Sequence, residues 1–294
     1  MNELISLIEK NNTGIKKLRK ILQTIIHEEC PRQRKVRTRY TTDKNLIKLT
    51  ILYLKTGQSY REVSCMGHIS KTYLTDKIND WNSHGIFTTM YDKLRQRYVD
   101  LRYNRTNRVT MTTIIDAAHI RNQYGTEDVS YHQKEKSKKA TKVSIIIDDA
   151  GAPMSLDVCK ASIADVKRLE ETVNKLPNNI HADQRQVCLL WDAGYIGQDI
   201  HDRIMNSKHI KVIAKRRRNQ QPNSVPEERK LRKRIRVERQ FSVLKYHKHL
   251  RERNDKKTSN FSMYVQIALC GMLLNTDVFQ NMTDRQLTSV INFF

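Results

Sequence analysis

The apolar residues change their spacing near residue 109, and this change constrains the fold more than any other feature of the sequence. Before it they follow the helical period, as in residues 3–28, where Ile15, Leu18 and Leu22 share one face. After it, short β-branched runs with a period near 2 alternate with helical patterns. The sequence therefore predicts an α/β fold, with a mixed sheet flanked by helices over residues 106–294 and an all-helical domain over residues 1–105.

Three short helices are expected within residues 42–82. The first ends at Gly57, a residue type that often follows a helix C-terminus. The second begins with a capping box, in which Ser59 precedes Glu62 by three residues. The third follows Ser70, another capping residue type. Their order and short connections predict a helix-turn-helix arrangement over about residues 42–82.

The third of these helices has a polar face opposite its apolar one. Lys71, Thr72 and Thr75 lie on the polar face. In a helix-turn-helix protein the second element of the motif enters the major groove, so we expect these side chains to contact DNA. Three small helices also pack together in proteins that do not bind DNA, and the pattern alone leaves that alternative open.

The α/β region has a recognisable order of elements. Residues 142–147 and 154–159 are expected to form a hairpin around a turn at 148–153, because the turn has Asp-Asp-Ala-Gly-Ala-Pro chemistry. The other expected elements are strands at 110–115, 187–191 and 209–214, and helices at 198–207, 230–246 and 262–275. The last helix is expected to cover the sheet.

The chain is strongly basic, with 54 Lys and Arg against 31 Asp and Glu and a net charge of +23. Such a charge favours a polyanionic partner, because neutralised phosphates release counterions. RNA and anionic lipid also attract basic proteins. Residues 211–253 hold 16 Lys or Arg and four acids, which indicates a DNA track. Arg216, Arg217, Arg218 and Arg239 belong to this segment, for which simple solvation or nuclear targeting is the alternative interpretation.

Membrane insertion and secretion are not expected. The longest apolar stretch, residues 264–274, is much shorter than the roughly 20 residues of a membrane span. The N-terminus lacks a basic leader followed by an apolar run, so we expect an intracellular protein, in the cytoplasm or nucleoid of a prokaryote or in the nucleus of a eukaryotic or virus-infected cell. The five cysteines are far apart in the sequence and predict neither a disulfide framework nor a zinc cage.

Three acids are candidates for a catalytic site. Asp116 follows the apolar residues 113–115, Asp192 follows residues 189–191, and Glu238 lies on a basic helix. Carboxylates at strand ends project from the carboxyl edge of a sheet, where α/β proteins place their sites. Converging carboxylates can bind divalent cations such as Mg²⁺ for phosphodiester chemistry. Singly, each acid also has an ordinary explanation: an aspartate can simply end a strand, and Glu238 can pair with Arg234 four residues earlier.

Several segments match motifs of a known family. They are residues 59–63 (SYREV), 81–87 (WNSHGIF), 115–120 (IDAAHI), 147–153 (IDDAGAP) and 191–195 (WDAGY). Arg234, Glu238 and Lys245 match the last three positions of a Tyr-(2)-Arg-(3)-Glu-(6)-Lys signature and fall within about 40° of one face on a continuous helix. In these segments the chain resembles the DDE transposases of the insertion-sequence-five-like group, whose catalytic domain is RNase H-like. The resemblance covers nearly all of the chain beyond about residue 43.

The resemblance implies a function for each matched residue. Asp116, Asp192 and Glu238 would be the catalytic acids and would bind two Mg²⁺ ions, with Mn²⁺ as a substitute, while Arg234 and Lys245 contact DNA. Metal-activated water would cleave the ends of the element, and the freed 3′-hydroxyl would attack target DNA. The partners would be double-stranded DNA, as terminal inverted repeats and target, and further copies of the chain in a homodimer or higher oligomer.

Two departures from the family pattern lie beside the acids. Leu231 stands where the signature has tyrosine, and Ala193 stands where a basic residue commonly follows the second aspartate. Two alternatives share the same motifs: a domesticated transposase descendant that binds DNA without transposition, and a metal-dependent nuclease without strand transfer. The presence of all three acids favours an active enzyme.

Overall fold

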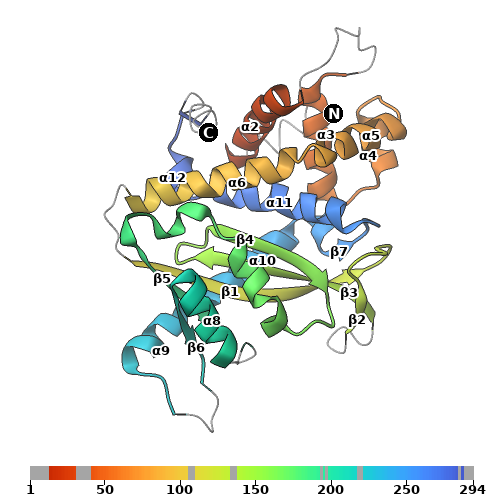
Figure 1. Cartoon of the computed structure of the whole chain (residues 1–294). Helices are drawn as coiled ribbons and strands as arrows, with labels where there is room; N and C mark the ends of the chain where they lie inside the picture. The colour runs from red at the N-terminus through yellow and green to blue at the C-terminus, as the bar shows by residue number, and fades with distance from the viewer. Residues whose placement is uncertain are drawn as a thin grey trace. The chain divides into compact units, whose positions relative to one another are not determined.

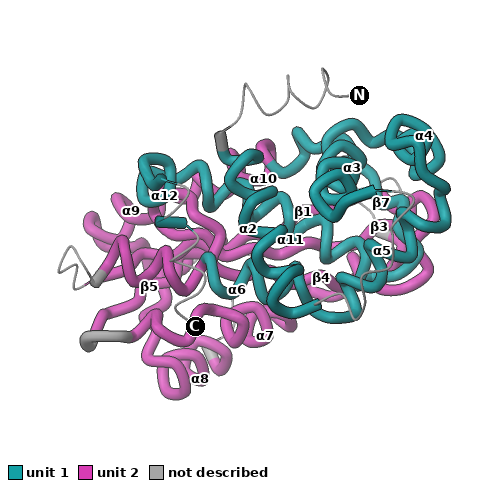
Figure 2. The backbone as a smooth tube through the Cα atoms, turned by 90° about the horizontal axis from the view of Figure 1, so that it is seen from above, with its two compact units in different colours: residues 1–94, 244–294 teal, residues 95–243 magenta. Residues whose placement is uncertain are grey.

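In a computed structural model of the whole chain (Figure 1), the residues form two compact units, which are coloured separately in Figure 2. Unit 1 contains residues 1–94 and 244–294, and unit 2 contains residues 95–243. The structure describes residues 13–30, 41–104, 110–132, 138–192, 195, 198–216, 221–283 and 286–287. The division predicted between residues 105 and 106 follows the order of elements along the chain, whereas the compact units group the C-terminal helices with the N-terminal ones.

Unit 1 is built mainly of helices. Its elements are α2 (Thr13–Glu29), α3 (Asp43–Thr56), α4 (Tyr60–Met66), α5 (Lys71–Ser83), η7 (Lys248–Leu250), β7 (Glu252–Arg253), α11 (Thr258–Leu274) and α12 (Asp277–Gln280), and α6 (Ile86–Val99) leads from it into unit 2. The apolar helix α11 packs against α2 and α5. Eleven of its residues are buried, so this helix belongs to the core of unit 1. None of the helices that the structure describes is long and apolar enough to cross a membrane.

The three short helices predicted within residues 42–82 are confirmed as α3, α4 and α5. Gly57 ends α3 with a φ of 65°, in the left-handed region that glycine adopts readily. The capping box of α4 is present, since the Ser59 amide donates to Glu62 Oε2 at 2.7 Å. Leu74, Ile78 and other apolar residues of α5 are buried, so its predicted inner face is correct.

Unit 2 contains the sheet. Its elements are η1 (Asp100–Asn104), β1 (Thr110–Asn122), β2 (Ser130–His132), β3 (Lys138–Asp148), β4 (Pro153–Lys160), η3 (Asp165–Arg168), α7 (Leu169–Asn174), η4 (Asn178–Gln184), β5 (Gln186–Trp191), α8 (Gln198–Lys208), β6 (Ile210–Ala214), α9 (Val225–Leu231) and η6 (Arg232–Arg234), followed by α10 (Ile235–Tyr246), which runs on into unit 1.

The sheet of unit 2 is mixed. Its strand order is β2-β3-β1-β5-β6, and β4 pairs with β3 (Figure 1). The strands β1, β5 and β6 are parallel, whereas β3 is antiparallel to both β1 and β4. Helix α7 packs against β3 and β4, α8 packs against β6, and α9 packs against β5 and β6. The predicted mixed sheet flanked by helices is confirmed.

Two predicted boundaries are wrong. β1 does not end before Asp116 but continues to Asn122, because β3 pairs with it from Thr113 to Arg121. The helix expected at 230–246 begins earlier, at α9, where the Ser224 amide donates to the Glu227 carboxylate at 3.0 Å. It is then interrupted by η6, a 3₁₀ turn, so Arg234 lies outside the helix that carries Glu238. The shared face was predicted for a continuous helix, whereas the helix that carries Glu238 and Lys245 begins directly after Arg234.

Candidate active site

The register of two parallel strands places Asp116 and Asp192 next to each other. The last residue pair between β1 and β5 is Ile114 with Leu190. Two residues further along the chain lie Asp116, within β1, and Asp192, directly after the last residue of β5. Neighbouring strands lie about 4.8 Å apart, so the two carboxylates leave the backbone at adjacent positions. Backbone pairing therefore brings together the first two predicted catalytic acids.

The end of β5 is fixed by its neighbours. Trp191, the last residue of the strand, is fully buried, and its ring centroid lies 5.9 Å from that of Tyr195. The Tyr195 amide donates to the Asp192 carbonyl at 3.1 Å, which turns the chain away from the sheet. The Asp192 side chain itself is 50% exposed. This arrangement directs the carboxylate to solvent at the carboxyl edge of the sheet.

Asp116 lies in a mixed electrostatic environment. Burial raises the pKa of its carboxyl group, the Ala117 amide and the Arg234 guanidinium lower it, the negative charge of Asp192 raises it, and the net result is a raised pKa. The Ala117 amide donates to Asp116 Oδ1 at 2.8 Å. Asp116 and Asp192 are thus close enough for their charges to act on each other, as expected for carboxylates that share a cation.

Arg234 is the cation of this site. Its Nη1 lies 3.2 Å from Asp192 Oδ1, and its side chain is only 16% exposed. The resemblance implied a DNA contact for this residue. In the structure its guanidinium neutralises part of the negative charge of the acid pair.

Glu238 is less closely tied to the other two acids. It lies in the first turn of α10, next to the buried Val237, and its own side chain is exposed. Among the described residues, one group of three possible ligand atoms lies within 4.8 Å of one another. It does not include Asp116, Asp192 or Glu238. The structure brings two of the three acids together, and the third remains a predicted ligand on a side chain with several rotatable bonds.

Asp165 is a residue near the site that the sequence reasoning missed. Its charge contributes to the raised pKa of Asp116 and, after burial, to the raised pKa of Tyr195. Its carboxylate accepts a hydrogen bond from Lys142 Nζ, whose side chain is almost fully buried. A lysine inside the apolar run 142–147 was the available signal, because a buried ammonium requires an acidic partner.

The three side chains of α5 that are predicted to contact DNA differ in their exposure to solvent. Lys71 and Thr72 are exposed. Thr75 is half-buried, and its hydroxyl donates within the helix, at 3.1 Å from the Lys71 carbonyl and 3.0 Å from the Thr72 carbonyl. Two of the three side chains are therefore open to a partner.

The predicted contacts in the basic segment are mainly exposed. Arg216, Arg239 and Lys245 are all exposed, on the chain after β6 and on α10. Arg217 and Arg218 lie outside the described residues.

The group of possible metal ligands whose atoms lie within 4.8 Å of one another consists of Cys30, Asp80 and His84. Its contacts are those of a helix end, because His84 Nδ1 lies 2.8 Å from the Asp80 carbonyl oxygen. Lys77 Nζ lies 3.0 Å from Asp80 Oδ2 and already supplies a positive charge. We therefore do not assign a metal site to this group.

The sheet and the acid pair define an α/β protein with an acidic site at the carboxyl edge of parallel strands. The chain belongs to the transposase DDE domain family, whose match covers residues 107–275, more than half of the sequence. Curated proteins give no significant match.

Solved structures give weak similarities. The Mos1 strand transfer complex has a TM-score of 0.31 and 13% identity, covering 89% of this chain and 76% of the other. A pre-cleavage Mos1 transpososome has a TM-score of 0.32 and 12% identity, covering 90% and 82%. A Mos1 mariner paired end complex with Mn has a TM-score of 0.25 and 12% identity, covering 76% and 84%. The family assignment rests on the sequence match and not on these structures.

Proposed function

We propose that this protein is a DNA transposase of the insertion-sequence-five-like group. It hydrolyses a phosphodiester bond at each end of its element, and the 3′-hydroxyl freed by this step attacks a phosphodiester of target DNA. The observation that carries the proposal is the β1–β5 register, which sets Asp116 beside Asp192 in a chain of the transposase DDE domain family.

The donor set fits a hard divalent cation. Carboxylate oxygens are the ligands that Mg²⁺ prefers, and a cation between Asp116 and Asp192 would offset the repulsion that already acts on Asp116. We propose that Glu238 is the third ligand and that the site takes two Mg²⁺ ions, which Mn²⁺ can replace. When bound, these ions activate the attacking oxygen and stabilise the leaving one.

The chain's own residues bind and orient the DNA in this proposal. Arg234 limits the negative charge at the acid pair, so that the phosphate backbone can approach it. Arg239 and Lys245, both exposed on α10, bind the backbone beside Glu238, and the exposed Lys71 and Thr72 of α5 contact duplex further along the element end. Each phosphate contact that is lost should reduce the slope of log affinity against log salt concentration by about 0.9.

Cleavage of the element's own ends tests the proposal. The substrate is duplex DNA carrying the inverted repeats that flank the coding region, incubated with Mg²⁺ or Mn²⁺ and, separately, with EDTA. We expect wild-type protein to cut it only with the metal, and Asp116→Asn, Asp192→Asn and Glu238→Gln to lose about two orders of magnitude or more of this activity. The variants should still bind the duplex.

The control is Asp199→Asn, which removes an exposed acid on α8 and should cut normally. Binding without any cutting by the wild type would overturn the proposal in favour of a DNA-binding descendant. Cutting without joining of a pre-cut end to target DNA would identify a nuclease instead.

We further propose that at least two copies of the chain act together, because an element has two ends and each end requires its own set of acids. Light scattering of the protein with and without end duplex measures this directly. A complex of two chains and two duplexes is expected, and a single chain on a single duplex throughout the cleavage reaction would contradict it.

A further inference from the structure

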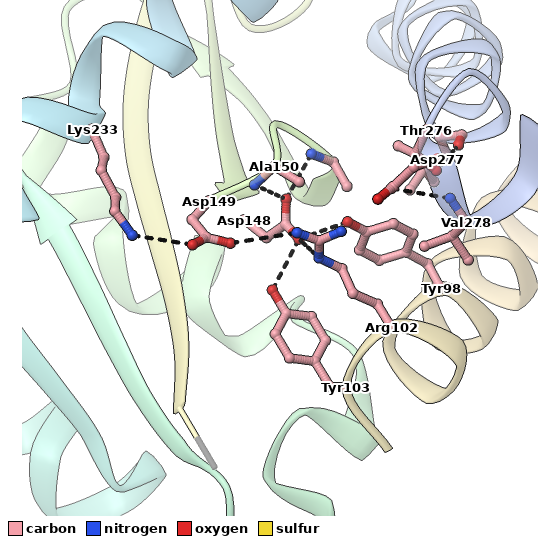
Figure 3. Close-up of polar contacts among 12 residues, drawn as sticks. Tyr98, Arg102, Tyr103, Asp148, Asp149, Ala150, Lys233, Thr276, Asp277 and Val278 are labelled. Atoms are coloured by element: carbon pink, nitrogen blue, oxygen red, sulfur yellow. Dashed lines mark hydrogen bonds and ion pairs between the residues drawn. The ribbon is translucent and has the colours of Figure 1, made fainter. Parts of the chain in front are cut away.

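The turn between β3 and β4, residues 148–153, contains a fully buried acid that the catalytic site does not use. Asp148 Oδ2 accepts hydrogen bonds from the Tyr98 hydroxyl at 2.7 Å and the Tyr103 hydroxyl at 2.9 Å (Figure 3). Asp148 Oδ1 accepts from the Ala150 amide at 2.9 Å and the Ala152 amide at 2.8 Å. Two tyrosines and two amides of its own loop thus fix the β3–β4 turn.

The next residue of the turn contacts the segment that precedes Glu238. Asp149 Oδ2 lies 3.1 Å from Lys233 Nζ, and the two side chains are 26% and 36% exposed (Figure 3). Arg102 Nη2 lies 3.9 Å from Asp149 Oδ1 on the other side. Asp149 is therefore placed between a cation of η1 and a cation of η6.

Lys233 and Arg234 are consecutive residues of η6, and each pairs with a different acid. Lys233 pairs with Asp149 of the turn, and Arg234 pairs with Asp192 of the acid pair. Successive side chains of a 3₁₀ helix point about 120° apart. The two ion pairs together fix the rotation of η6, from which α10 and Glu238 continue.

The turn also approaches α10 beyond Glu238. Gly151 has a φ of +91°, and a Cβ built on it would lie 2.5 Å from Gln240 Nε2. The positive φ favours glycine at this position, and the side-chain amide of Gln240 lies close to the backbone there. The turn therefore contacts the chain on both sides of Glu238, at Lys233 and at Gln240.

We propose that the β3–β4 turn is a positioning element for Glu238, acting through the Asp149–Lys233 ion pair and the close approach of Gly151 to Gln240. The inference rests on the proposed function of Glu238 as third ligand. Through these contacts the turn restrains the backbone that carries Glu238, which lies on a helix outside the hydrogen-bond pattern of the sheet. Asp149 and Lys233 are positioning residues and do not themselves touch the substrate.

Hydrogen exchange of the full-length protein tests the physical part of the proposal. In Asp149→Asn and Lys233→Met the amides of residues 232–240 should exchange several-fold faster than in wild type, while those of β5 stay unchanged. Lys160→Met, which removes an exposed lysine at the end of β4, is the matched control. Unchanged exchange at 232–240 in both variants would overturn the proposal, whether or not the protein cuts DNA.

Cleavage of the end duplex tests the catalytic part. A displaced Glu238 should raise the Mn²⁺ concentration needed for half-maximal cutting and lower the maximal rate by on the order of tenfold to a hundredfold. Duplex affinity should be unchanged in Asp149→Asn, which removes no positive charge from the basic segment. Lys233→Arg, which keeps the charge, should restore most of the rate. The double variant Asp149→Asn/Lys233→Met should be no worse than either single variant, because both remove the same contact.

The outcomes separate this inference from the proposed function. If wild-type protein does not cut, the proposed function fails, and the exchange measurement alone decides whether the turn holds residues 232–240. If wild type cuts and Asp149→Asn and Lys233→Met cut with unchanged rate and Mn²⁺ dependence, the positioning role is overturned while the proposed function stands.

Discussion

Two regions of unit 2 supply the predicted catalytic acids, and they hold them in different ways. Asp116 and Asp192 lie on adjacent parallel strands, and the backbone hydrogen bonds that end at Ile114 and Leu190 determine their relative position. Glu238 lies on α10, whose preceding turn is held by side-chain pairs such as Asp149 with Lys233. A sheet register changes only in whole residues, whereas side-chain pairs can loosen gradually. The sheet register therefore holds the first two acids, and we expect the position of the third to depend on contacts that single substitutions can weaken.

The largest effect is expected when the anchor of the β3–β4 turn is removed. Asp148→Ala would leave the Tyr98 and Tyr103 hydroxyls and two loop amides without their buried acceptor. We expect a loss of about 3–5 kcal/mol in the free energy of unfolding, measured by urea denaturation.

Tyr98→Phe serves as the graded control, because it deletes one hydrogen bond and should cost about 1–2 kcal/mol. A loss below about 1 kcal/mol for Asp148→Ala would mean that the turn is not anchored through this acid.

Acid pH is expected to weaken the sheet of unit 2 independently of the substitutions in the β3–β4 turn. Asp157 of β4 is fully buried and accepts hydrogen bonds from Arg168 Nη2 at 2.7 Å and Lys175 Nζ at 2.6 Å. Burial alone would raise the pKa of Asp157, but these two cations outweigh it and the pKa is lowered.

A lowered folded-state pKa adds stability that is fully present above the ordinary aspartate pKa of about 3.9 and is lost as the pH falls through the folded value. We expect urea denaturation between pH 6 and pH 2 to show a loss of about 2 kcal/mol from this group. Asp157→Asn should be less stable at pH 6 and lose less on acidification. Equal acid losses in both proteins would refute the contribution of this pair.

A smaller effect is expected at the contact between β1 and β5. The buried Thr113 hydroxyl donates to the Cys188 carbonyl at 3.1 Å, in addition to the backbone pairing of the two strands. Thr113→Val keeps the shape and loses this bond, and we expect a cost of about 1 kcal/mol in urea denaturation. Because the backbone ladder sets the register, cutting of the end duplex should stay near wild type. A large loss of cutting would show that the acid pair depends on this side chain as well.

The smallest effects are expected when the acids themselves are replaced and stability is measured in the absence of metal. Burial and the charge of Asp192 raise the pKa of Asp116, so its charged form is unfavourable in the folded protein. Asp116→Asn should therefore raise the free energy of unfolding by less than about 1 kcal/mol and the thermal midpoint slightly. Glu238→Gln, at an exposed site, should change the free energy of unfolding by no more than about 0.5 kcal/mol. Calorimetry in EDTA measures both. A destabilising Asp116→Asn would contradict the view of the acid pair as an electrostatically strained site.

The sequence predicts the helical region, the mixed sheet and the positions of the acids after apolar runs. It does not predict the continuation of β1 to Asn122, because residues 117–122 have no strong alternation and only pairing with β3 extends the strand. The interruption of the long basic helix at η6 was also missed, because every residue type from 230 to 246 is compatible with a helix.

Contacts within the site were harder to predict than its acids. Arg234 was expected to contact DNA, and its ion pair with Asp192 was not predicted. The turn at 148–153 was predicted from its composition, whereas the burial of Asp148 follows from Tyr98 and Tyr103, about 50 residues earlier in the chain. Such pairings depend on the tertiary fold, and no local spacing encodes them.

Metal-directed cleavage of the protein backbone tests whether Asp116, Asp192 and Glu238 converge on the same cations. Fe²⁺ replaces Mg²⁺ in the full-length protein bound to end duplex, and with ascorbate and peroxide it generates radicals that cut the chain beside the bound metal. If three acids from two strands and a helix converge on the same cations, the cuts fall near residues 116, 192 and 238, and excess Mg²⁺ suppresses all three together. Cuts near 116 and 192 with none near 238, or cuts that Mg²⁺ does not suppress, would contradict it.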